Sequence, residues 1–169
     1  MRLVVIGGEA AGLSAASRAR RIDRSLDIVV LEKSGAISYA ACGLPYYLAG
    51  KIDRIDPLIA YSPEYFRRER NIDVRTGAEA ASIGHARREL TLSNGERIPY
   101  DRLVIATGAR PDRASIPGAD SPEVFSLHAL HDAVRLRERL ETGRTKRAVV
   151  IGAGYIGLEA AAALRGHGL

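Results

Sequence analysis

The single cysteine of this 169-residue chain, Cys42, lies in a sequence that suits a reactive thiol. Ser38 and Tyr39 precede it, and Gly-Leu-Pro follows it at the predicted start of a short helix. A helix N-terminus favours the thiolate, which is the nucleophilic form of the side chain. A lone cysteine is more often a small buried residue, but this context favours a redox or nucleophilic role. Because there is only one cysteine, no disulfide can form within the chain.

A first glycine-rich stretch, residues 7–12, has the pattern of a dinucleotide-binding turn. It follows a short apolar run, residues 3–6, and precedes residues 11–22, which have helical spacing. Such a turn lets phosphates approach the backbone at a helix N-terminus. Glu32, at the end of the next predicted strand, can bind a ribose hydroxyl. Glu9 departs from the pattern, because it takes the place of the second glycine of G-x-G-x-x-G.

A second glycine turn, residues 152–157, carries all three glycines of that pattern. It follows a predicted strand at 148–151 and opens a predicted helix that reaches about Leu164. The turns are about 145 residues apart, too far for a repeat array, so they predict two nucleotide-binding domains. The acid expected about 20 residues later lies beyond Leu169, and NADH and NADPH therefore cannot be distinguished. The strand that should follow is missing, so we expect a fragment of a longer protein.

The pattern of elements predicts an α/β fold: a doubly wound, Rossmann-like domain with a β-meander, then the start of a second Rossmann-like domain. Asn94-Gly95 is a strong hairpin turn within the meander, and Ser62 and Pro63 suit a helix start. Prolines between Pro111 and Pro122 predict a linker. The other predicted elements are strands at 26–31, 73–76 and 102–106, meander strands at 78–83, 89–92 and 97–99, and helices at 63–70 and 127–141.

The composition indicates a globular chain with a basic surplus, since 46% of the residues are hydrophobic, 27% are charged and the net charge is +5. The arginines cluster at 18–24, 67–75 and 135–147 without interleaved aromatics, so we expect no nucleic-acid partner. These clusters indicate either solvated helix faces or attraction of anionic small molecules. No signal peptide or membrane-length apolar run is evident, so a cytoplasmic location is expected. No metal ligands are assigned.

The stretch from Ser38 to Pro45 resembles the S-F-x-x-C-x-x-P active-site motif of coenzyme A–disulfide reductases and related single-cysteine flavoenzymes. The opening V-V-I-G-G-x-A-A-G is similar to the same family, which accepts a residue other than glycine where Glu9 lies. Residues 106–108, Ala-Thr-Gly, resemble the family's segment near FAD. The resemblance covers essentially the whole chain. The cysteine motif is fairly specific, whereas many flavoproteins share the glycine motifs.

The resemblance implies an FAD-dependent NAD(P)H:disulfide oxidoreductase, in which electrons pass from NAD(P)H through FAD to Cys42. In coenzyme A–disulfide reductases this cysteine cycles through a mixed disulfide with coenzyme A. The related NADH oxidases and peroxidases use a cysteine sulfenic acid, and that alternative stays open. A third hypothesis is a non-catalytic nucleotide-binding fragment, because the family completes the FAD site and its homodimer with segments that follow residue 169.

The resemblance also assigns site residues, beginning with Cys42 and Ser38 as the catalytic pair. The substrate is expected to be a small-molecule disulfide of the coenzyme A type or a related thiol or persulfide, or else peroxide or oxygen. The predicted substrate-binding residues are Ser14, Arg18, Arg21, Ala41 and Arg70, of which Ala41 departs from the usual asparagine. The predicted residues for the cofactors FAD and NAD(P)H are Gly7, Gly8, Ala10, Ala11, Gly12, Glu32, Lys33, Ala80, Ala106, Thr107, Gly108, Gly152, Gly154, Tyr155, Ile156, Gly157 and Glu159.

Three parts of the chain are predicted from these assignments. Residues 1–110 are expected to form an FAD-binding domain with the redox cysteine. Residues 111–126 are expected to be a linker, and residues 127–169 the truncated start of an NAD(P)H-binding domain.

Overall fold

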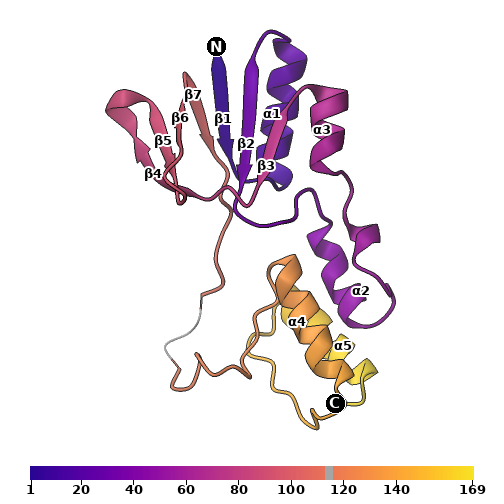
Figure 1. Cartoon of the computed structure of the whole chain (residues 1–169). Helices are drawn as coiled ribbons and strands as arrows, with labels where there is room; N and C mark the ends of the chain where they lie inside the picture. The colour runs from indigo at the N-terminus through magenta and orange to yellow at the C-terminus, as the bar shows by residue number, and fades with distance from the viewer. Residues whose placement is uncertain (113–115) are drawn as a thin grey trace. The chain divides into compact units, whose positions relative to one another are not determined.

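The computed structural model describes residues 1–112 and 116–169, and the chain forms two compact units (Figure 1). The first unit consists of Met1–Tyr39 and Ile59–Gly108, and the second of Ala40–Leu58 and Ala109–Leu169. Residues 113–115 of the predicted linker lie outside the described residues. By its contacts Cys42 belongs to the second unit. The boundary at residue 110 between an FAD and an NAD(P)H domain stays a prediction.

The first unit is built on a parallel four-stranded sheet with the order β3-β2-β1-β7 (Figure 1). Helix α1 (Ala10–Ile22) joins β1 to β2, and α3 (Pro63–Arg70) precedes β3. The strand order reverses beside β1, and ligands of such sheets bind outside the carboxyl ends of the strands at this point. The strands are β1 (Arg2–Ile6), β2 (Asp27–Glu32), β3 (Asp73–Thr76) and β7 (Arg102–Ile105).

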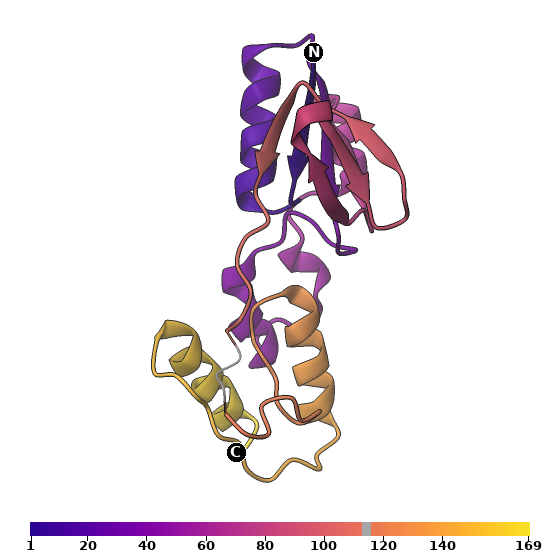
Figure 2. The same ribbon diagram turned by 90° about the vertical axis from the view of Figure 1, so that its left-hand side faces the viewer.

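Alternate residues of β1 pack on opposite faces of this sheet. Leu3 and Val5 belong to the core that α1 and α3 cover, whereas Val4 and Ile6 belong to the core beneath the meander. Figure 2 shows the parallel sheet between α1 and the meander. Each fully buried aliphatic side chain contributes roughly 1.5–3 kcal/mol, so both layers hold β1 in place. The meander strands are β4 (Ala80–Gly84), β5 (Glu89–Leu92) and β6 (Arg97–Pro99).

The predicted α/β fold with a parallel sheet is confirmed, and each strand predicted in this unit is present. The ends differ by one or two residues, and β4 is followed by a 3₁₀ turn, η3 (His85–Arg87). The Asn94-Gly95 turn joins β5 to β6 as predicted. Gly95 has φ +87°, and its N–H donates to the carbonyl oxygen of Leu92 at 2.9 Å.

The second unit packs short helices around a small apolar core in which Leu48, Leu140 and Ala163 are buried. Arg137 of α4 donates from Nη1 to the carbonyl oxygen of Tyr47 at 3.1 Å, and its guanidinium lies over the Tyr47 ring. The arginine therefore ties α4 to α2. The elements are η1 (Ala41–Gly43), α2 (Leu44–Leu48), η2 (Asp56–Leu58), α4 (Leu130–Glu141) and α5 (Tyr155–Gly166).

One prediction for this unit is wrong, and two predicted helices start later than expected. Residues 148–151 do not form a strand, and Val149 and Ile151 are 89% and 77% exposed. Over the described ranges, no strand pairs with them, and a strand without neighbours has no partners for its backbone groups. The helix predicted at 127–141 begins at Leu130. The helix expected to start near Cys42 starts at Leu44, because a 3₁₀ turn comes first.

Candidate functional site

The first glycine turn links β1 to α1 with a backbone that only glycine fits. Gly7 has φ +114°, and a Cβ there would overlap the backbone carbonyl of Ala106. A Cβ on Gly12 would overlap the carbonyl oxygen of Gly7. The close approach of these three residues sets the N-terminus of α1 at the carboxyl end of β1. Backbone N–H groups at such a helix start can bind a phosphate.

Glu32 ends β2 beside this turn and is buried, with 9% of its surface exposed. Its Oε2 accepts a hydrogen bond from the N–H of Gly8 at 2.8 Å, and its Oε1 accepts one from the N–H of Ser34 at 2.7 Å. Both carboxylate oxygens are therefore fixed at the turn. An acid in this position binds a ribose hydroxyl of a dinucleotide. The Glu32 carboxylate, as a hydrogen-bond acceptor, fits the ribose in the adenosine half of FAD.

The other predicted residues of the first cofactor site lie around the same strand ends. The N–H of Ala106 donates to the carbonyl oxygen of Ile6 at 2.8 Å, which carries the chain from β7 to the crevice beside β1. Thr107 and Gly108 follow and are exposed. Ala10 and Ala11 are exposed in the first turn of α1, and Lys33 is exposed after β2. Ala80 instead lies on β4, where it packs against the core beneath the meander.

Glu9 brings a second carboxyl group to the first glycine turn. It is the N-cap residue of α1, with an extended backbone at φ −102°, but its side chain makes no capping bond. The carboxyl group accepts a hydrogen bond from the backbone N–H of Tyr39. Its Oε1 is buried, without a hydrogen-bond partner among the described residues. Burial, and then the nearby Glu32 carboxylate, raise the pKa of Glu9 to about 7.

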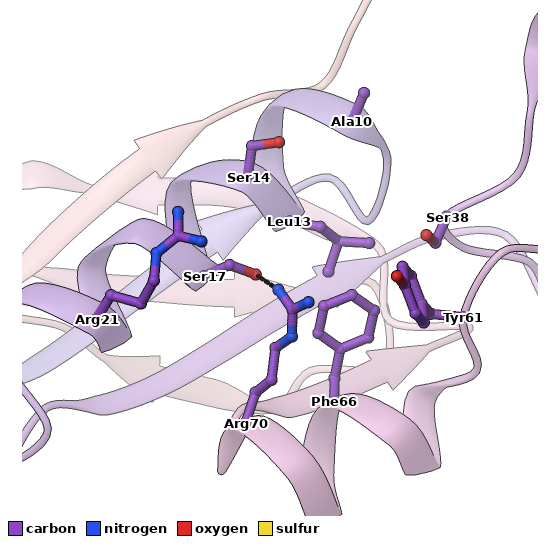
Figure 3. A pocket seen from close by; sticks show the side chains of 9 residues that line it. All are labelled: Ala10, Leu13, Ser14, Ser17, Arg21, Ser38, Tyr61, Phe66 and Arg70. Carbon is purple, nitrogen blue, oxygen red and sulfur yellow. Dashed lines mark hydrogen bonds between the residues drawn. The ribbon is translucent and has the colours of Figure 1, made fainter.

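A pocket of about 230 Å³ opens between α1 and α3 (Figure 3). It brings together four residues predicted for the substrate or the catalytic pair: Ser14, Arg21, Ser38 and Arg70. Ala10, predicted for the cofactor, also lines it. Sequence analysis missed Leu13, Ser17, Tyr61 and Phe66 of the same pocket. Ser17 lies three residues after Ser14, so the helical spacing of α1 could have revealed it.

The guanidinium of Arg70 is held firmly in this pocket. Its Nη1 donates to Ser17 Oγ at 2.7 Å, drawn as a dashed line in Figure 3. Its central carbon lies 5.7 Å from the ring centre of Tyr61 and 5.4 Å from those of Tyr65 and Phe66. Aromatic faces attract a cation at this distance. The charge is therefore positioned before any ligand arrives.

Arg21 differs from Arg70, because its charge is not engaged. Within the part of the chain that the structure describes, no hydrogen bond or ion pair occupies its side chain. A free guanidinium at a pocket can bind a phosphate through two parallel hydrogen bonds. The basic surface continues into a groove of about 630 Å³. The groove is lined by Ser17, Arg20, Arg21, Arg24, Arg68, Glu69, Arg70 and Asn71. Arg18, predicted for the substrate, is exposed on α1 and lines neither cavity.

Cys42 is exposed in the 3₁₀ turn η1, next to the exposed Ala41. The turn is anchored inside the second unit, since a Cβ on Gly43 would overlap the side chain of Leu58. Helix α2 has five residues and starts at Leu44, directly after the turn that holds the cysteine, and the expected stabilisation of the thiolate by a helix N-terminus stays a prediction. An exposed thiol can still meet an external disulfide. Ser38 belongs to the first unit, and its pairing with Cys42 stays a prediction.

The second glycine turn repeats the local geometry of the first. Gly152 has φ +110°, and a Cβ on Gly157 would overlap the Gly152 carbonyl oxygen. Gly154 is the N-cap residue of α5, and Tyr155 begins the helix with 90% of its surface exposed. Ile156 and Glu159 are exposed as well.

Two further features bear on the class of protein. No helix within residues 1–112 and 116–169 is long and apolar enough to cross a membrane. The described residues also bring together no three His, Cys, Asp or Glu side chains that could hold a metal ion.

The sheet order, the glycine turn and the fixed Glu32 carboxylate define a Rossmann-like dinucleotide-binding fold. The whole chain, residues 1–169, matches the family model described as pyridine nucleotide-disulphide oxidoreductase. The chain belongs to this family of oxidoreductases, which depends on FAD and a pyridine nucleotide.

Similar proteins in this family have different substrates in their names. An "NAD(P)H sulfur oxidoreductase (CoA-dependent)" of Pyrococcus abyssi is 40% identical over 98% of this chain and 37% of its own length. An "NADH oxidase" of Methanocaldococcus jannaschii is 36% identical over 100% of this chain and 39% of its own length. The solved structure of an NAD-dependent persulfide reductase from A. fulgidus is 41% identical, with a TM-score of 0.93 over 99% of this chain and 32% of that one. This chain thus spans less than two fifths of the length of each of these three relatives.

Proposed function

We propose that this chain is the dinucleotide-binding and thiol-bearing part of an FAD- and NAD(P)H-dependent reductase of coenzyme A disulfide or coenzyme A persulfide. The observation that carries the proposal is the pocket between α1 and α3, in which Arg21 has no partner among the described residues and Arg70 is held beside serine hydroxyls. Phosphate and pyrophosphate groups suit two guanidinium groups flanked by hydroxyl donors. Coenzyme A carries both kinds of group.

The chain's own residues fit the adenosine half of FAD. The N–H groups at the start of α1 would bind the pyrophosphate, and Glu32 would accept from the ribose hydroxyls. Residues 106–108 would lie beside the cofactor at the end of β7. When bound, FAD would supply the two-electron relay between the pyridine nucleotide and the substrate disulfide.

Cys42 would act by thiol–disulfide exchange. Its thiolate attacks one sulfur of coenzyme A disulfide, a Cys42–coenzyme A disulfide forms, and one coenzyme A thiolate leaves. Two electrons that originate in NAD(P)H then break this mixed disulfide, which regenerates the Cys42 thiolate and releases the second coenzyme A. The exposure of the side chain supports this role, because the attacking sulfur must reach an external molecule.

A second candidate is an NADH oxidase or peroxidase, in which the Cys42 thiolate reduces peroxide and becomes a sulfenic acid. The exposed, unpaired thiol and the similarity to the M. jannaschii protein favour it.

In either case we expect little or no turnover and weak FAD binding from the chain alone, because it spans 37–39% of its curated relatives. A homodimer and a cytoplasmic location are proposed only for the full-length protein. Robust disulfide reduction by these 169 residues would contradict this expectation.

The pocket can be tested without turnover by calorimetric titration with adenosine 3′,5′-bisphosphate, which carries the phosphate pattern of coenzyme A without its thiol. We expect Arg21→Gln to weaken binding about tenfold, since one charge-assisted phosphate contact is lost. Arg87→Gln is the matched control, because Arg87 is an exposed arginine on η3, outside the pocket. Equal affinities for the wild type and Arg21→Gln would refute the assignment of this pocket.

The redox role of Cys42 is tested by the visible spectrum of the FAD-reconstituted chain during anaerobic titration with NADH. A long-wavelength charge-transfer band that is lost in Cys42→Ser would support a thiolate against the flavin. Bound flavin without such a band in the wild type would refute the redox role. Coenzyme A disulfide and hydrogen peroxide, supplied separately to the reduced protein, would distinguish the two candidate functions.

A further inference from the structure

Glu9 occupies the position at which a dinucleotide-binding turn normally has a glycine, so that phosphates can approach the backbone. The second turn of this chain has Gly154 at the equivalent position. The backbone is extended at both residues, with φ −102° at Glu9 and −77° at Gly154. The glutamate therefore costs no backbone strain. What it adds to the turn is a carboxyl group.

We propose that Glu9 controls FAD binding through its own protonation: the turn accepts FAD while the Glu9 carboxyl group is neutral and resists it when that group is ionised. This inference rests on the proposed function, in which FAD binds at the first glycine turn. It makes Glu9 a positioning and specificity residue of the cofactor site.

The surroundings of Glu9 favour its neutral form. From the end of β2, the Glu32 carboxylate faces it, and that carboxylate is held by the N–H groups of Gly8 and Ser34. From the segment after β2, the Tyr39 N–H is the group that opposes protonation, together with the positive end of α1. Burial and Glu32 outweigh them and raise the pKa of Glu9 to about 7. Glu9 is therefore the carboxyl group of this turn that takes up a proton near neutral pH.

The protonated form of Glu9 can donate a hydrogen bond to FAD, which the ionised form cannot do. Oε1 of Glu9 is buried, without a hydrogen-bond partner within the described residues, and an ionised carboxylate with such an oxygen is disfavoured. A protonated carboxyl group has an O–H donor, which a pyrophosphate or ribose oxygen can accept. An ionised carboxylate has no donor and repels the two negative charges of the pyrophosphate. Bound FAD should therefore raise the proton affinity of Glu9 further, and binding should take up a proton when Glu9 is ionised beforehand.

The experiment is a titration of FAD fluorescence quenching by the wild-type chain, Glu9→Gln and the matched control Glu138→Gln. Glu138 is an exposed carboxylate of α4, outside the first unit, so its change alters the net charge equally. Below about pH 6 Glu9 is mostly neutral, and all three proteins should bind FAD similarly. At about pH 8.5 the wild type and Glu138→Gln should bind about tenfold more weakly than at pH 6, whereas Glu9→Gln should change less than about twofold. Calorimetry in two buffers of different ionisation enthalpy should show proton uptake near neutral pH only where Glu9 is present.

The outcomes separate this inference from the function on which it rests. If all three proteins bind FAD with one shared pH dependence, the role of Glu9 is refuted and the proposed function stands. If none binds FAD at any pH, including a Glu9→Gly variant that restores the usual glycine, FAD binding by this chain is refuted and the inference falls with it. A pH dependence that is lost only in Glu9→Gln and Glu9→Gly supports both.

Discussion

The two glycine turns of this chain have nearly the same backbone in very different surroundings. Gly7 and Gly152 have φ +114° and +110°, and in each turn a later glycine packs against the first carbonyl oxygen. A Cβ on Gly7 would overlap the backbone of Ala106, whereas a Cβ on Gly152 would meet no atom of the described residues within 4 Å. Val4, before the first turn, is fully buried, but Val149, before the second, is 89% exposed.

The difference shows that local sequence determines a turn, whereas packing determines a strand. The glycine spacing alone gives the second turn its φ angle and its close backbone approach. Residues 148–151 have a strand-like sequence, yet strand formation needs hydrogen-bonding neighbours that the described residues do not offer them. The first turn is therefore a supported site, and the second is a turn with the same local shape.

The largest expected effect comes from the hydrophobic cores of the two units. Phe66, 2% exposed, packs in the core beneath α1 and α3, and Phe66→Ala should destabilise the first unit by about 3–5 kcal/mol. Leu140→Ala, in the small core of the second unit, should cost about 2 kcal/mol. Urea unfolding followed by circular dichroism gives the total loss, and hydrogen exchange locates it.

Hydrogen exchange of these two variants should change in different parts of the chain. Phe66→Ala should speed exchange in β1 and β2, and Leu140→Ala should speed it in α4 and α5. If each variant loosened both units equally, the description of two separately packed cores would be wrong.

The next largest effect concerns the turns directly. Gly12→Ala should destabilise the first unit by about 1–3 kcal/mol, because the added methyl group meets a carbonyl oxygen that neighbouring strands hold in place. Gly157→Ala creates the same local overlap, but its turn has room to move and the cost should stay below about 1 kcal/mol. Chemical denaturation of both variants, beside the wild type, provides the measurement. Equal costs would mean that the turns alone, and not their surroundings, set the energetics.

The same distinction explains what the sequence could and could not predict. Periodicity and glycine spacing predicted the parallel sheet, the meander and the place of Glu32, because each depends on neighbours that are also present in the chain. The wrong strand prediction at residues 148–151 arose because a strand-like sequence had no neighbouring strand among the described residues. Tyr61 and Phe66 were missed at the pocket because aromatic residues near a predicted helix give no sign of the arginine that they face. The sequence showed that Glu9 replaces the second glycine of the motif, but it could not show that Oε1 of Glu9 is buried.

A smaller effect should appear as a pH dependence of stability that only the first turn shows. The pKa of Glu9 is raised from 4.5 to about 7 in the folded chain. Between these values the unfolded chain has lost the proton that the folded chain keeps, so stability falls as pH rises from about 4.5 and the loss is complete above about 7. Because Glu9 is only half-buried, we expect a loss of about 1–2 kcal/mol rather than the full value of the shift.

Glu9→Gln should remove this pH dependence, and Glu138→Gln should keep it. Urea midpoints at about pH 5 and about pH 8 measure the difference. An unchanged pH profile in Glu9→Gln would show that other groups, such as the histidines, cause the dependence.

The smallest effect tests whether helix starts, unlike strands, are independent of the surroundings. Ser62 Oγ accepts from the N–H of Tyr65 at 3.2 Å at the start of α3, and Asp132 Oδ2 accepts from the N–H of Ala129 at 2.9 Å at the start of α4. Each bond satisfies a backbone donor that the helix leaves unpaired. Ser62→Ala and Asp132→Ala should therefore each cost about 1 kcal/mol, although they lie in different units. Hydrogen exchange measures the stability that each helix loses. Similar losses in the two variants would show that helix caps, like the glycine turns, are determined by local sequence. A much smaller loss for Asp132→Ala would show that helix starts also depend on packing.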